Sequence, residues 1–411
     1  MTNITNPQYY MDLEAKYGAH NYHPLPVVLA KGKGAKVWDV EGKEYYDFLS
    51  AYSAVNQGHS HPKIVGAMKE QLNSIALTSR AFYNNKLGPF TKFVTEYFGY
   101  DKILPMNSGA EADETALKLA RKWGYEVKGI PENQAKIICC EENFHGRTIA
   151  IISMSTDPDA TTNFGPFVPG IEKIPYDDVD ALEKKLDEIG DVTCGFILEP
   201  IQGERGVYVP HDGYLKKAYD LCKKHNVLFI ADEVQTGIGR TGRLLACDYE
   251  DVRPDILILG KALSGGTMPV SAVLADDEIM LRIKPGEHGS TFGGNPVACA
   301  VAQAALEVIR DEKLTEGAVA KGERFRQYIR DLNDPNIVLV RGKGLLNAAI
   351  IKERNGLEAW DLCLIMQKNG VLAKPTHGDI IRFAPPLVIT DEELEDALER
   401  IKKSIEEYGK A

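Results

Sequence analysis

The sequence lacks three features that would assign it to large classes of protein. It has no apolar run long enough to span a bilayer, and no internal repeat, low-complexity tract or Pro/Ser-rich linker. Positive charge is in deficit, because 48 Lys and Arg face 59 Asp and Glu and give a formal net charge of −11. Nucleic acids and anionic membranes bind clustered basic surfaces, so neither is expected as a partner. A local basic pocket for a small acidic substrate remains compatible with this balance.

Cysteine is scarce and shows no pairing pattern. The seven cysteines form no C-x-x-C motif, and most stand inside apolar segments. This predicts reduced core residues rather than a disulfide framework, and the adjacent Cys139 and Cys140 are interpreted in the same way. The first residues, MTNITNPQYYMDLEAKYG, have neither the apolar core of a signal peptide nor the Arg-rich pattern of a transit peptide. A cytoplasmic location is therefore expected.

The main feature that is present is an alternation of short apolar strands with amphipathic helices. Strands are predicted at residues 102–106, 135–141, 194–200, 227–233, 255–261 and 270–276. These segments are apolar throughout rather than alternating, which is typical of strands covered on both faces. We therefore expect an α/β fold with a mainly parallel central sheet between layers of helices.

The two ends of the chain follow different patterns. The segment AKVWDVEGKEYYDF alternates around Glu41-Gly42 and predicts a hairpin. Towards the C-terminus a long helix continues to ERFRQYIRDL, and short strands and two more helices follow, which indicates a smaller α+β domain. The expected organisation is an N-terminal segment at residues 1–55, a large domain at 56–310 and a small C-terminal domain at 311–411.

One predicted strand end resembles a binding site for an anion. Ser108, Gly109 and Ala110 follow the first strand and open a helix in MNSGAEADE. Ligands bind at the carboxyl ends of strands in open α/β sheets, and free amides at a helix N-terminus suit a phosphate. Taken alone, the turn is more often an ordinary strand-to-helix connection.

Two further strand ends carry charged residues, and a third carries an aromatic one. Lys261 follows the apolar LILG, where a charged lysine is costly to bury. Loss of its proton relieves that cost and makes the lysine a Schiff-base former, although a lysine can also extend its amine to solvent. Asp232 suits a pyridinium nitrogen, although it could also cap a helix. With Phe144 to stack on a ring, these pieces together predict a site for pyridoxal 5′-phosphate.

A resemblance then extends this interpretation. The ordered motifs NSGAEA, NFHGRT, EPIQGE, ADEVQTG, LGKALSGG and GSTFGGNP resemble those of the class III pyridoxal phosphate-dependent aminotransferases, of fold type I, along essentially the whole chain. Longer strings, such as HNYHPLPVVL, KPGEHGSTFGGNP and AKPTHGDIIRFAPP, are similar to the ornithine-transaminating branch of that family. A fold type I transferase with a smaller α+β C-terminal domain is therefore expected.

The resemblance implies roles at the cofactor. Lys261 would form the Schiff base and shuttle the proton, Asp232 would pair with the pyridine nitrogen, and Gln235 would face the phenolic oxygen. Phe144 would stack on the ring. The phosphate would be held near Ser108 by the amides of Gly109 and Ala110, and by Ser290 and Thr291 of the partner subunit. That last role implies a homodimer, either alone or within a larger assembly.

The resemblance also implies roles at the substrate. Arg147 and Arg382 would bind carboxylates, Tyr22 and Tyr52 would shape the ornithine pocket, and Glu204 would face Arg382. The implied reaction moves the δ-amino group of L-ornithine to 2-oxoglutarate. It gives L-glutamate and glutamate 5-semialdehyde, which cyclises to pyrroline-5-carboxylate.

Two positions depart from the expected pattern. His145 stands where some relatives have a tryptophan, and Arg205 follows Glu204 where a small residue is expected. Arg205 would weaken the role of Glu204 if its side chain pointed inward.

Several alternatives are weighed against this hypothesis. Relatives acting on N-acetylornithine or 4-aminobutyrate are near ones, but a phenol at Tyr22 or Tyr52 can anchor a free α-amino group that acetylation would block. A lysine lyase without pyridoxal would not need Asp232, and a non-catalytic protein on the same fold would not need Lys261. GIGRTG at residues 237–242 lacks a following crossover helix, which disfavours a dinucleotide site. The histidine pairs in GHSHP and HNYH lack a third ligand cluster, so no metal is expected.

Overall fold

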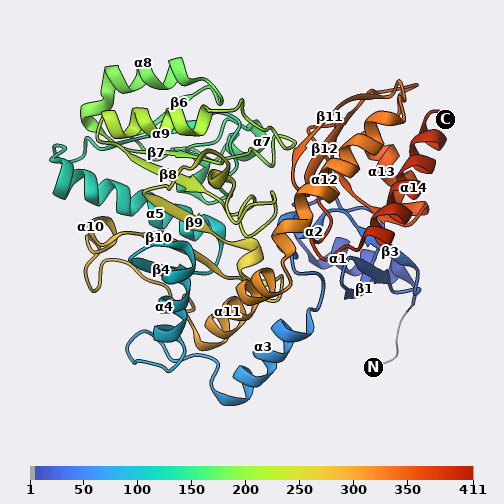
Figure 1. The fold of residues 1–411 in the computed structure, drawn as a ribbon, viewed down its shortest axis with the longest axis horizontal. Helices are drawn as coiled ribbons and strands as arrows, with labels where there is room; N and C mark the ends of the chain where they lie inside the picture. The colour runs from blue at the N-terminus through green and yellow to red at the C-terminus, as the bar shows by residue number, and fades with distance from the viewer. Residues whose placement is uncertain (1–4, 411) are drawn as a thin grey trace.

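The computed structural model describes residues 5–410 and is built around one large sheet (Figure 1). Its strand order is β4-β10-β9-β8-β7-β5-β6. The bounds are β4 (Lys102–Met106), β5 (Lys136–Cys140), β6 (Ile171–Ile174), β7 (Thr193–Leu198), β8 (Leu228–Asp232), β9 (Ile256–Leu259) and β10 (Ser271–Ala275). The six strands expected from the sequence are confirmed, whereas β6 was missed. It is an edge strand with a half-exposed burial pattern, so its sequence IEKI is not continuously apolar.

The sheet is mainly parallel, as expected. Strands β5 to β9 pair in parallel, while β10 is antiparallel to both β4 and β9. The strand β4 therefore points in the same direction as β9 and β8. As a result the carboxyl ends of β4, β5, β7, β8 and β9 meet at one edge of the sheet, and this edge carries the site described below.

Helices cover both faces of this sheet, which explains why its strands are apolar on both sides. On β5, Ile137 and Cys139 pack into a core with α5 (Gly109–Trp123). The alternate residues Ile138 and Cys140 pack on the other face with α8 (Val179–Ile189) and α9 (Tyr214–Lys224). All seven cysteines are buried and free, which confirms that they are reduced core residues.

The helices α3 (Pro62–Ser74) and α4 (Leu87–Phe98) each pack against α11 (Pro296–Asp311) beside the large sheet (Figure 1). The remaining short elements of this part are α6 (Ile149–Ile152), α7 (Pro158–Thr161), α10 (Asp277–Met280), a π-helix (Gly124–Lys128) and 3₁₀ turns (Gly190–Val192, Ala246–Glu250, Lys261–Ser264). Among the described residues, no helix combines the length and apolar character needed to cross a membrane.

The N-terminal segment that carries β1 and β3 lies beside the C-terminal part of the chain, on the opposite side of the molecule from α8 and α9 (Figure 1). The expected hairpin is confirmed as an antiparallel pair of β2 (Lys36–Asp39) and β3 (Glu44–Asp47), flanked by β1 (Leu29–Lys33). The strand β3 also pairs with β13 (Val371–Leu372), so the N-terminal and C-terminal segments share one sheet. The proposed boundaries at residues 55 and 310 stay a prediction, and residues 1–4 of the first segment lie outside the described chain.

A third sheet, in the order β11-β12-β15-β14, completes the C-terminal part. Its bounds are β11 (Ile337–Lys343), β12 (Leu346–Ile351), β14 (Lys374–Thr376) and β15 (Ile380–Phe383), and the helices beside it are α12 (Leu314–Asp331), α13 (Ala359–Lys368) and α14 (Asp391–Tyr408). The helices α1 (Pro7–Tyr17) and α2 (Ser50–Ser53) belong to the N-terminal segment.

The expectation of one continuous helix running towards ERFRQYIRDL is wrong. The helix α11 ends at Asp311 and α12 begins at Leu314, with Lys313 in the left-handed region at φ 51°. Neither glycine nor proline marks this break. It arises because α11 packs against α3 and α4, whereas α12 packs against β11 and α14 of the small domain.

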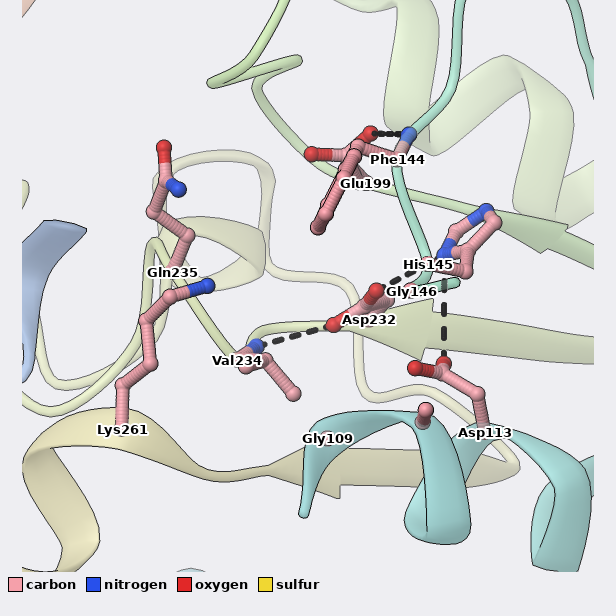
Figure 2. Close-up of a pocket in the computed structure, with 11 residues that line it drawn as sticks. Gly109, Asp113, Phe144, His145, Gly146, Glu199, Asp232, Val234, Gln235 and Lys261 are labelled. Carbon is pink, nitrogen blue, oxygen red and sulfur yellow. Dashed lines mark hydrogen bonds and ion pairs between the residues drawn. The ribbon is translucent and has the colours of Figure 1, made fainter. Parts of the chain in front are cut away.

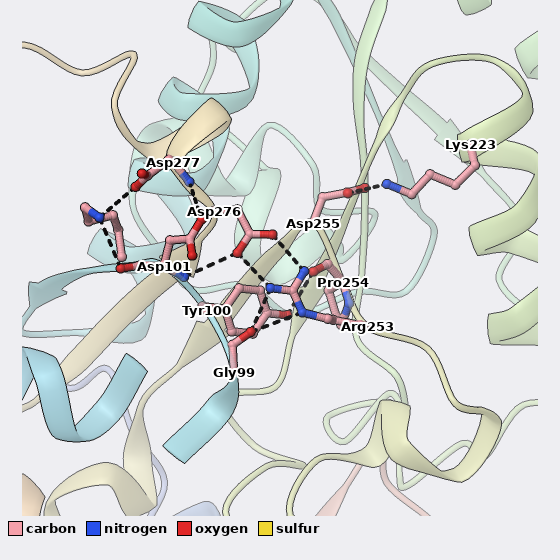
Figure 3. Close-up of polar contacts among 10 residues, drawn as sticks. Gly99, Tyr100, Asp101, Lys223, Arg253, Pro254, Asp255, Asp276 and Asp277 are labelled. Atoms are coloured by element: carbon pink, nitrogen blue, oxygen red, sulfur yellow. Dashed lines mark hydrogen bonds and ion pairs between the residues drawn. The ribbon is translucent and has the colours of Figure 1, made fainter. Parts of the chain in front are cut away.

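Ion pairs and hydrogen bonds tie the amino ends of the parallel strands together (Figure 3). Arg253 donates to both carboxylate oxygens of Asp276 at 2.7 and 2.9 Å and to the carbonyl of Gly99 at 2.7 Å, with its guanidinium 4.1 Å from the Tyr100 ring centroid. A bidentate contact of this kind holds one geometry. This network lies at the edge of the sheet opposite the site described below, so it stabilises the fold and does not contact that site.

Candidate active site

A cavity of about 170 Å³ opens where the carboxyl ends of the parallel strands meet (Figure 2). It is lined by Gly109, Ala110, Asp113, Phe144, His145, Gly146, Glu199, Asp232, Val234, Gln235 and Lys261. Six of these residues are the cofactor contacts expected from the sequence, and tertiary structure brings those six together. The cavity also includes Asp113, Glu199 and His145, for which the sequence predicts no role.

The turn after β4 has the local structure of an anion site. Ser108 caps α5, its side chain accepts from the Glu111 amide at 3.2 Å, and the Glu111 side chain accepts in return from the Ser108 amide at 2.8 Å. The amides of Gly109 and Ala110, in the first turn of the helix, have no acceptor within the helix and border the cavity. An anionic phosphate matches these donors and the positive end of the helix dipole.

Lys261 stands in a strained backbone conformation directly after β9. Its φ is 40°, in a backbone region that residues other than glycine rarely adopt. Such strain persists only where the surrounding structure determines it, and it is typical of functional residues. The amine lines the same cavity as Asp232 and Phe144, so a lysine, a carboxylate and an aromatic ring are available to one ligand.

Asp232 ends β8 and is 4% exposed. Its Oδ1 accepts from the Val234 amide at 3.0 Å, and its Oδ2 lies 2.7 Å from Nδ1 of His145 (Figure 2). Asp232 therefore does not cap a helix, which was the alternative considered from the sequence. A buried carboxylate that lines the cavity suits a protonated ring nitrogen.

Glu204 lies between Gln235, which lines the cavity, and Arg382. Its Oε1 accepts from Nη1 of Arg382 at 2.6 Å and from Nε2 of Gln235 at 3.3 Å. Burial opposes ionisation of Glu204, but the guanidinium outweighs it and holds the pKa of Glu204 below its ordinary value. A Cβ on Gly203 would lie 1.6 Å from Oε1 of Gln235, so the glycine is needed for this approach.

Tyr52 reaches this region from an unusual turn. Ser50, Ala51, Tyr52 and Ser53 all have positive φ values, between 46° and 72°, so α2 is a left-handed turn without glycine. Each such residue costs about 1–2 kcal/mol. The Tyr52 ring lies 4.8 Å from the Arg382 guanidinium, and the turn therefore places a phenol beside the Glu204 pair.

The other predicted substrate residues lie nearer the surface. Tyr22 is 75% exposed but close enough to Tyr52 to affect its pKa, which burial raises. Arg147 is exposed, lies 5.3 Å from the Phe144 ring centroid and pairs with Asp157 at 3.3 Å. Neither side chain is among the residues that line the cavity.

Arg205 does not point towards Glu204. It pairs with Glu142, and its guanidinium lies 4.2 Å from the Tyr208 ring centroid. The condition under which it would weaken Glu204 is therefore not met.

Ser290 and Thr291 lie on a loop that is held by α5 and by the turn before it in the same chain. Ser290 Oγ accepts from Asn107 Nδ2 at 2.7 Å, and His288 Nε2 lies 2.8 Å from Thr115 Oγ1. Thr291 is exposed, so it remains available to another subunit.

Arg240, within GIGRTG, has a structural role that the sequence did not reveal. It is fully buried and donates to Asn56 Oδ1 at 2.6 Å and to the carbonyls of Leu345 and Pro385 at 2.9 and 2.6 Å. It therefore ties the large domain to both ends of the chain. No helix opens at residues 237–242, so the segment lacks the context of a dinucleotide site.

Comparisons with known proteins agree with this geometry. The family described as class III aminotransferases matches residues 17–405. A mitochondrial ornithine aminotransferase of Drosophila ananassae is 63% identical over 392 residues, which cover 95% of this chain and 90% of that protein. Both chains are thus compared over nearly their full length.

Two solved structures are similar over almost the whole chain. The ornithine aminotransferase of Toxoplasma gondii has a TM-score of 0.96 at 51% identity, covering 99% of this chain and 96% of that one. A second structure of that protein has partial occupancy of PLP at its active site. An acetylornithine aminotransferase of Elizabethkingia anophelis has a TM-score of 0.90 at 61% identity, covering 98% of this chain and 99% of that one.

Proposed function

The chain belongs to the class III aminotransferases, and from this premise we propose that it transfers the δ-amino group of L-ornithine to 2-oxoglutarate. The products are L-glutamate and glutamate 5-semialdehyde, which cyclises to pyrroline-5-carboxylate. The observation that carries this proposal is the Glu204–Arg382 pair at 2.6 Å beside Tyr52. Gln235 connects this pair to the cavity that Lys261 and Asp232 line, because its Nε2 donates to Glu204 at 3.3 Å.

The family's cofactor, pyridoxal 5′-phosphate, fits the residues present. Lys261 would bind its carbonyl carbon, Asp232 its ring nitrogen, and the amides of Gly109 and Ala110 its phosphate. Phe144 offers a flat face, and Gln235 an amide, to the same ring. The bound cofactor supplies an electron sink for negative charge at the reacting substrate carbon.

The side chains then divide the remaining work. Lys261 is the one amine among the residues that line the cavity, so it would carry the proton to and from the substrate carbon. Arg147, whose guanidinium lies 5.3 Å from the Phe144 ring centroid, would hold the α-carboxylate of ornithine, and Tyr22 its α-amino group. This pose leaves the δ-amino group at the reacting end.

Glu204 and Arg382 would allow one cavity to take two unlike substrates. Ornithine has no carboxylate beside its reacting carbon, so Glu204 would neutralise Arg382 in that half-reaction. Glutamate and 2-oxoglutarate bring a carboxylate to that position, and a carboxylate can exchange for Glu204 on the guanidinium. An unpaired buried cation would otherwise be costly.

N-acetylornithine is the second candidate substrate, because an acetylornithine aminotransferase is 61% identical to this chain. The test offers ornithine, N-acetylornithine and 4-aminobutyrate separately with 2-oxoglutarate, and measures glutamate. Ornithine should be used most efficiently and should give pyrroline-5-carboxylate. Faster turnover of N-acetylornithine, or the 2-oxo acid of ornithine as product, would contradict the proposed pose.

We further propose a homodimer in which Ser290 and Thr291 of the partner subunit complete the phosphate site. Exposure of Thr291 and of the neighbouring Phe292, which is 55% exposed, supports this. Lys261→Ala and Thr291→Ala chains should each have low activity alone. Together they should recover activity, because a mixed dimer has one site with both native residues. No recovery, despite mixed dimers seen by native mass spectrometry, would contradict the shared site.

A further inference from the structure

His145 is buried directly behind Asp232. Its side chain is 0% exposed, and Nδ1 lies 2.7 Å from Asp232 Oδ2 and 3.8 Å from Asp113 Oδ1 (Figure 2). An ionised carboxylate can only accept a hydrogen bond, so Nδ1 carries a proton in this contact. Among the described residues, Nε2 of His145 has no hydrogen-bond partner, and its protonation state is not set by a second acceptor.

The groups around this imidazole are mostly acidic. Asp113 faces it from α5, Glu199 from the segment after β7, and Asp232 from β8, and their exposed fractions are 1%, 5% and 4%. Three carboxylates in one buried volume cannot all ionise without a cation among them. Lys261, after β9, is the other basic group lining the cavity, and the proposed function commits its nitrogen to the cofactor.

The protonation preferences of these groups agree with one charge arrangement. Burial, together with the charges of Asp232 and Glu199, raises the pKa of Asp113 well above its ordinary value. Burial raises the pKa of Glu199 to about 7, although the charge of His145 opposes this shift. Burial disfavours the imidazolium, but the hydrogen bond to Asp232 outweighs it and raises the pKa of His145. These directions favour a neutral Asp113 beside a positively charged His145.

We propose that His145 is a positioning residue that acts through Asp232. As a buried imidazolium it holds Oδ2 of the carboxylate, so that Oδ1, which also accepts from the Val234 amide, is the oxygen left for the cofactor's ring nitrogen. Its positive charge lowers the proton affinity of the bound cofactor. Glu199, which accepts from the Phe144 amide at 2.8 Å, is the counter-charge that keeps this cation in place. The inference rests on the proposed function, because it assigns Asp232 to the ring nitrogen of pyridoxal phosphate.

The electrostatic sign of this role can be tested. Removal of a nearby positive charge makes protonation easier, so loss of the His145 charge should raise the pH midpoint at which the visible absorption of the bound cofactor titrates. Removal of a nearby negative charge makes protonation of the cofactor harder. Glu199 is ionised above pH 7, so in that range the loss of its charge should lower the pH midpoint of the cofactor absorption.

The main variant is His145→Asn, since Nδ2 of asparagine takes the place of Nδ1 of histidine. It keeps a donor to Asp232 but cannot be charged. His211→Asn is the matched control, because His211 Nδ1 also lies 2.6 Å from a carboxylate, that of Asp177, on a side chain that is 89% exposed. The midpoint should rise by about one pH unit in His145→Asn, a tenfold change in proton affinity, fall in Glu199→Gln, and stay unchanged in the control.

A second readout uses the cofactor-free protein. The Cε1 proton of His145, assigned by its absence from the ¹H–¹³C spectrum of His145→Asn, should titrate at a higher pH than that of an ordinary histidine. An imidazole that is already neutral at pH 7, or a midpoint in His145→Asn within about 0.2 units of wild type, would overturn the inference.

The two proposals fail in different ways. Wild-type protein that gains no visible absorption with pyridoxal phosphate, or makes no glutamate from ornithine, contradicts the proposed function, whatever the imidazole titration shows. Active wild-type protein with an unshifted His145→Asn midpoint contradicts only the role of His145.

Discussion

Replacement of Glu204 by alanine would test how one cavity serves two substrates. In wild type, Arg382 is 6% exposed on its side chain and donates to Glu204 at 2.6 Å. Glu204→Ala leaves that guanidinium without its carboxylate while ornithine reacts. Glutamate brings its own carboxylate, so the same change removes a competitor from its half-reaction.

The magnitude follows from the type of contact. A hydrogen bond between charged groups contributes about 1.5–3 kcal/mol, and Glu204, whose side chain is 24% exposed, belongs near the lower end. A loss of about 1.4 kcal/mol is tenfold in kcat/KM. We therefore expect the ornithine half-reaction to slow at least tenfold relative to the glutamate half-reaction, which keeps or gains efficiency.

The assay is stopped-flow absorbance of each half-reaction, with ornithine or glutamate added to the enzyme without the second substrate. Glu204→Gln should give an intermediate ratio, because the amide oxygen still accepts but carries no charge. Glu142→Ala is the matched control, since this neighbouring carboxylate pairs with Arg205 rather than Arg382. An equal slowing of both half-reactions by Glu204→Ala would refute the exchange and leave Glu204 with a structural role.

Three further predictions concern the cofactor and the fold. Lys261→Ala should lose the visible absorption of the bound cofactor and nearly all turnover, and retention of both would assign the bond to another lysine. Ala51→Gly should raise the free energy of unfolding by about 1 kcal/mol in urea titrations, because Ala51 has φ 46°, whereas Ala67→Gly within helix α3 should lower it by a similar amount. The pKa of Glu199 rises on folding from 4.5 to about 7, so its stabilising contribution is full below pH 4.5 and is lost as the pH passes 7. In the cofactor-free protein, Glu199→Gln should therefore have a free energy of unfolding up to about 3 kcal/mol higher than wild type at pH 8. Near pH 4.5 the two proteins should have the same free energy of unfolding. An equal difference at both pH values would contradict the burial of a charge at Glu199.

The sequence by itself determined the strands of the main sheet, except at its edge. A strand with a continuous apolar sequence such as LILG keeps its side chains from water only when both of its faces are buried. The position of such a strand in the chain and its place inside the sheet therefore follow from the local sequence. β6 was missed because an edge strand is half-exposed and does not need that pattern. Lys261 and Asp232 were also predictable, since charged residues directly after buried strands meet at one edge of a parallel sheet.

Only the tertiary structure decided which distant residues touch. His145 and Asp232 are 87 residues apart in the chain, and Arg382 and Glu204 are 178 apart, so no local pattern links either pair. The resemblance to the family suggested the second pair but treated His145 as a departure.

Backbone strain was equally hidden from the sequence. The left-handed turn that carries Tyr52 has no glycine to signal it, because it is imposed by contacts from elsewhere in the fold, such as the Asp47 side chain that accepts from the Ser50 amide at 2.9 Å. Local sequence specifies elements through burial and propensity, whereas contacts between strand ends depend on how the elements pack. The chemistry of this site resides mainly in those contacts.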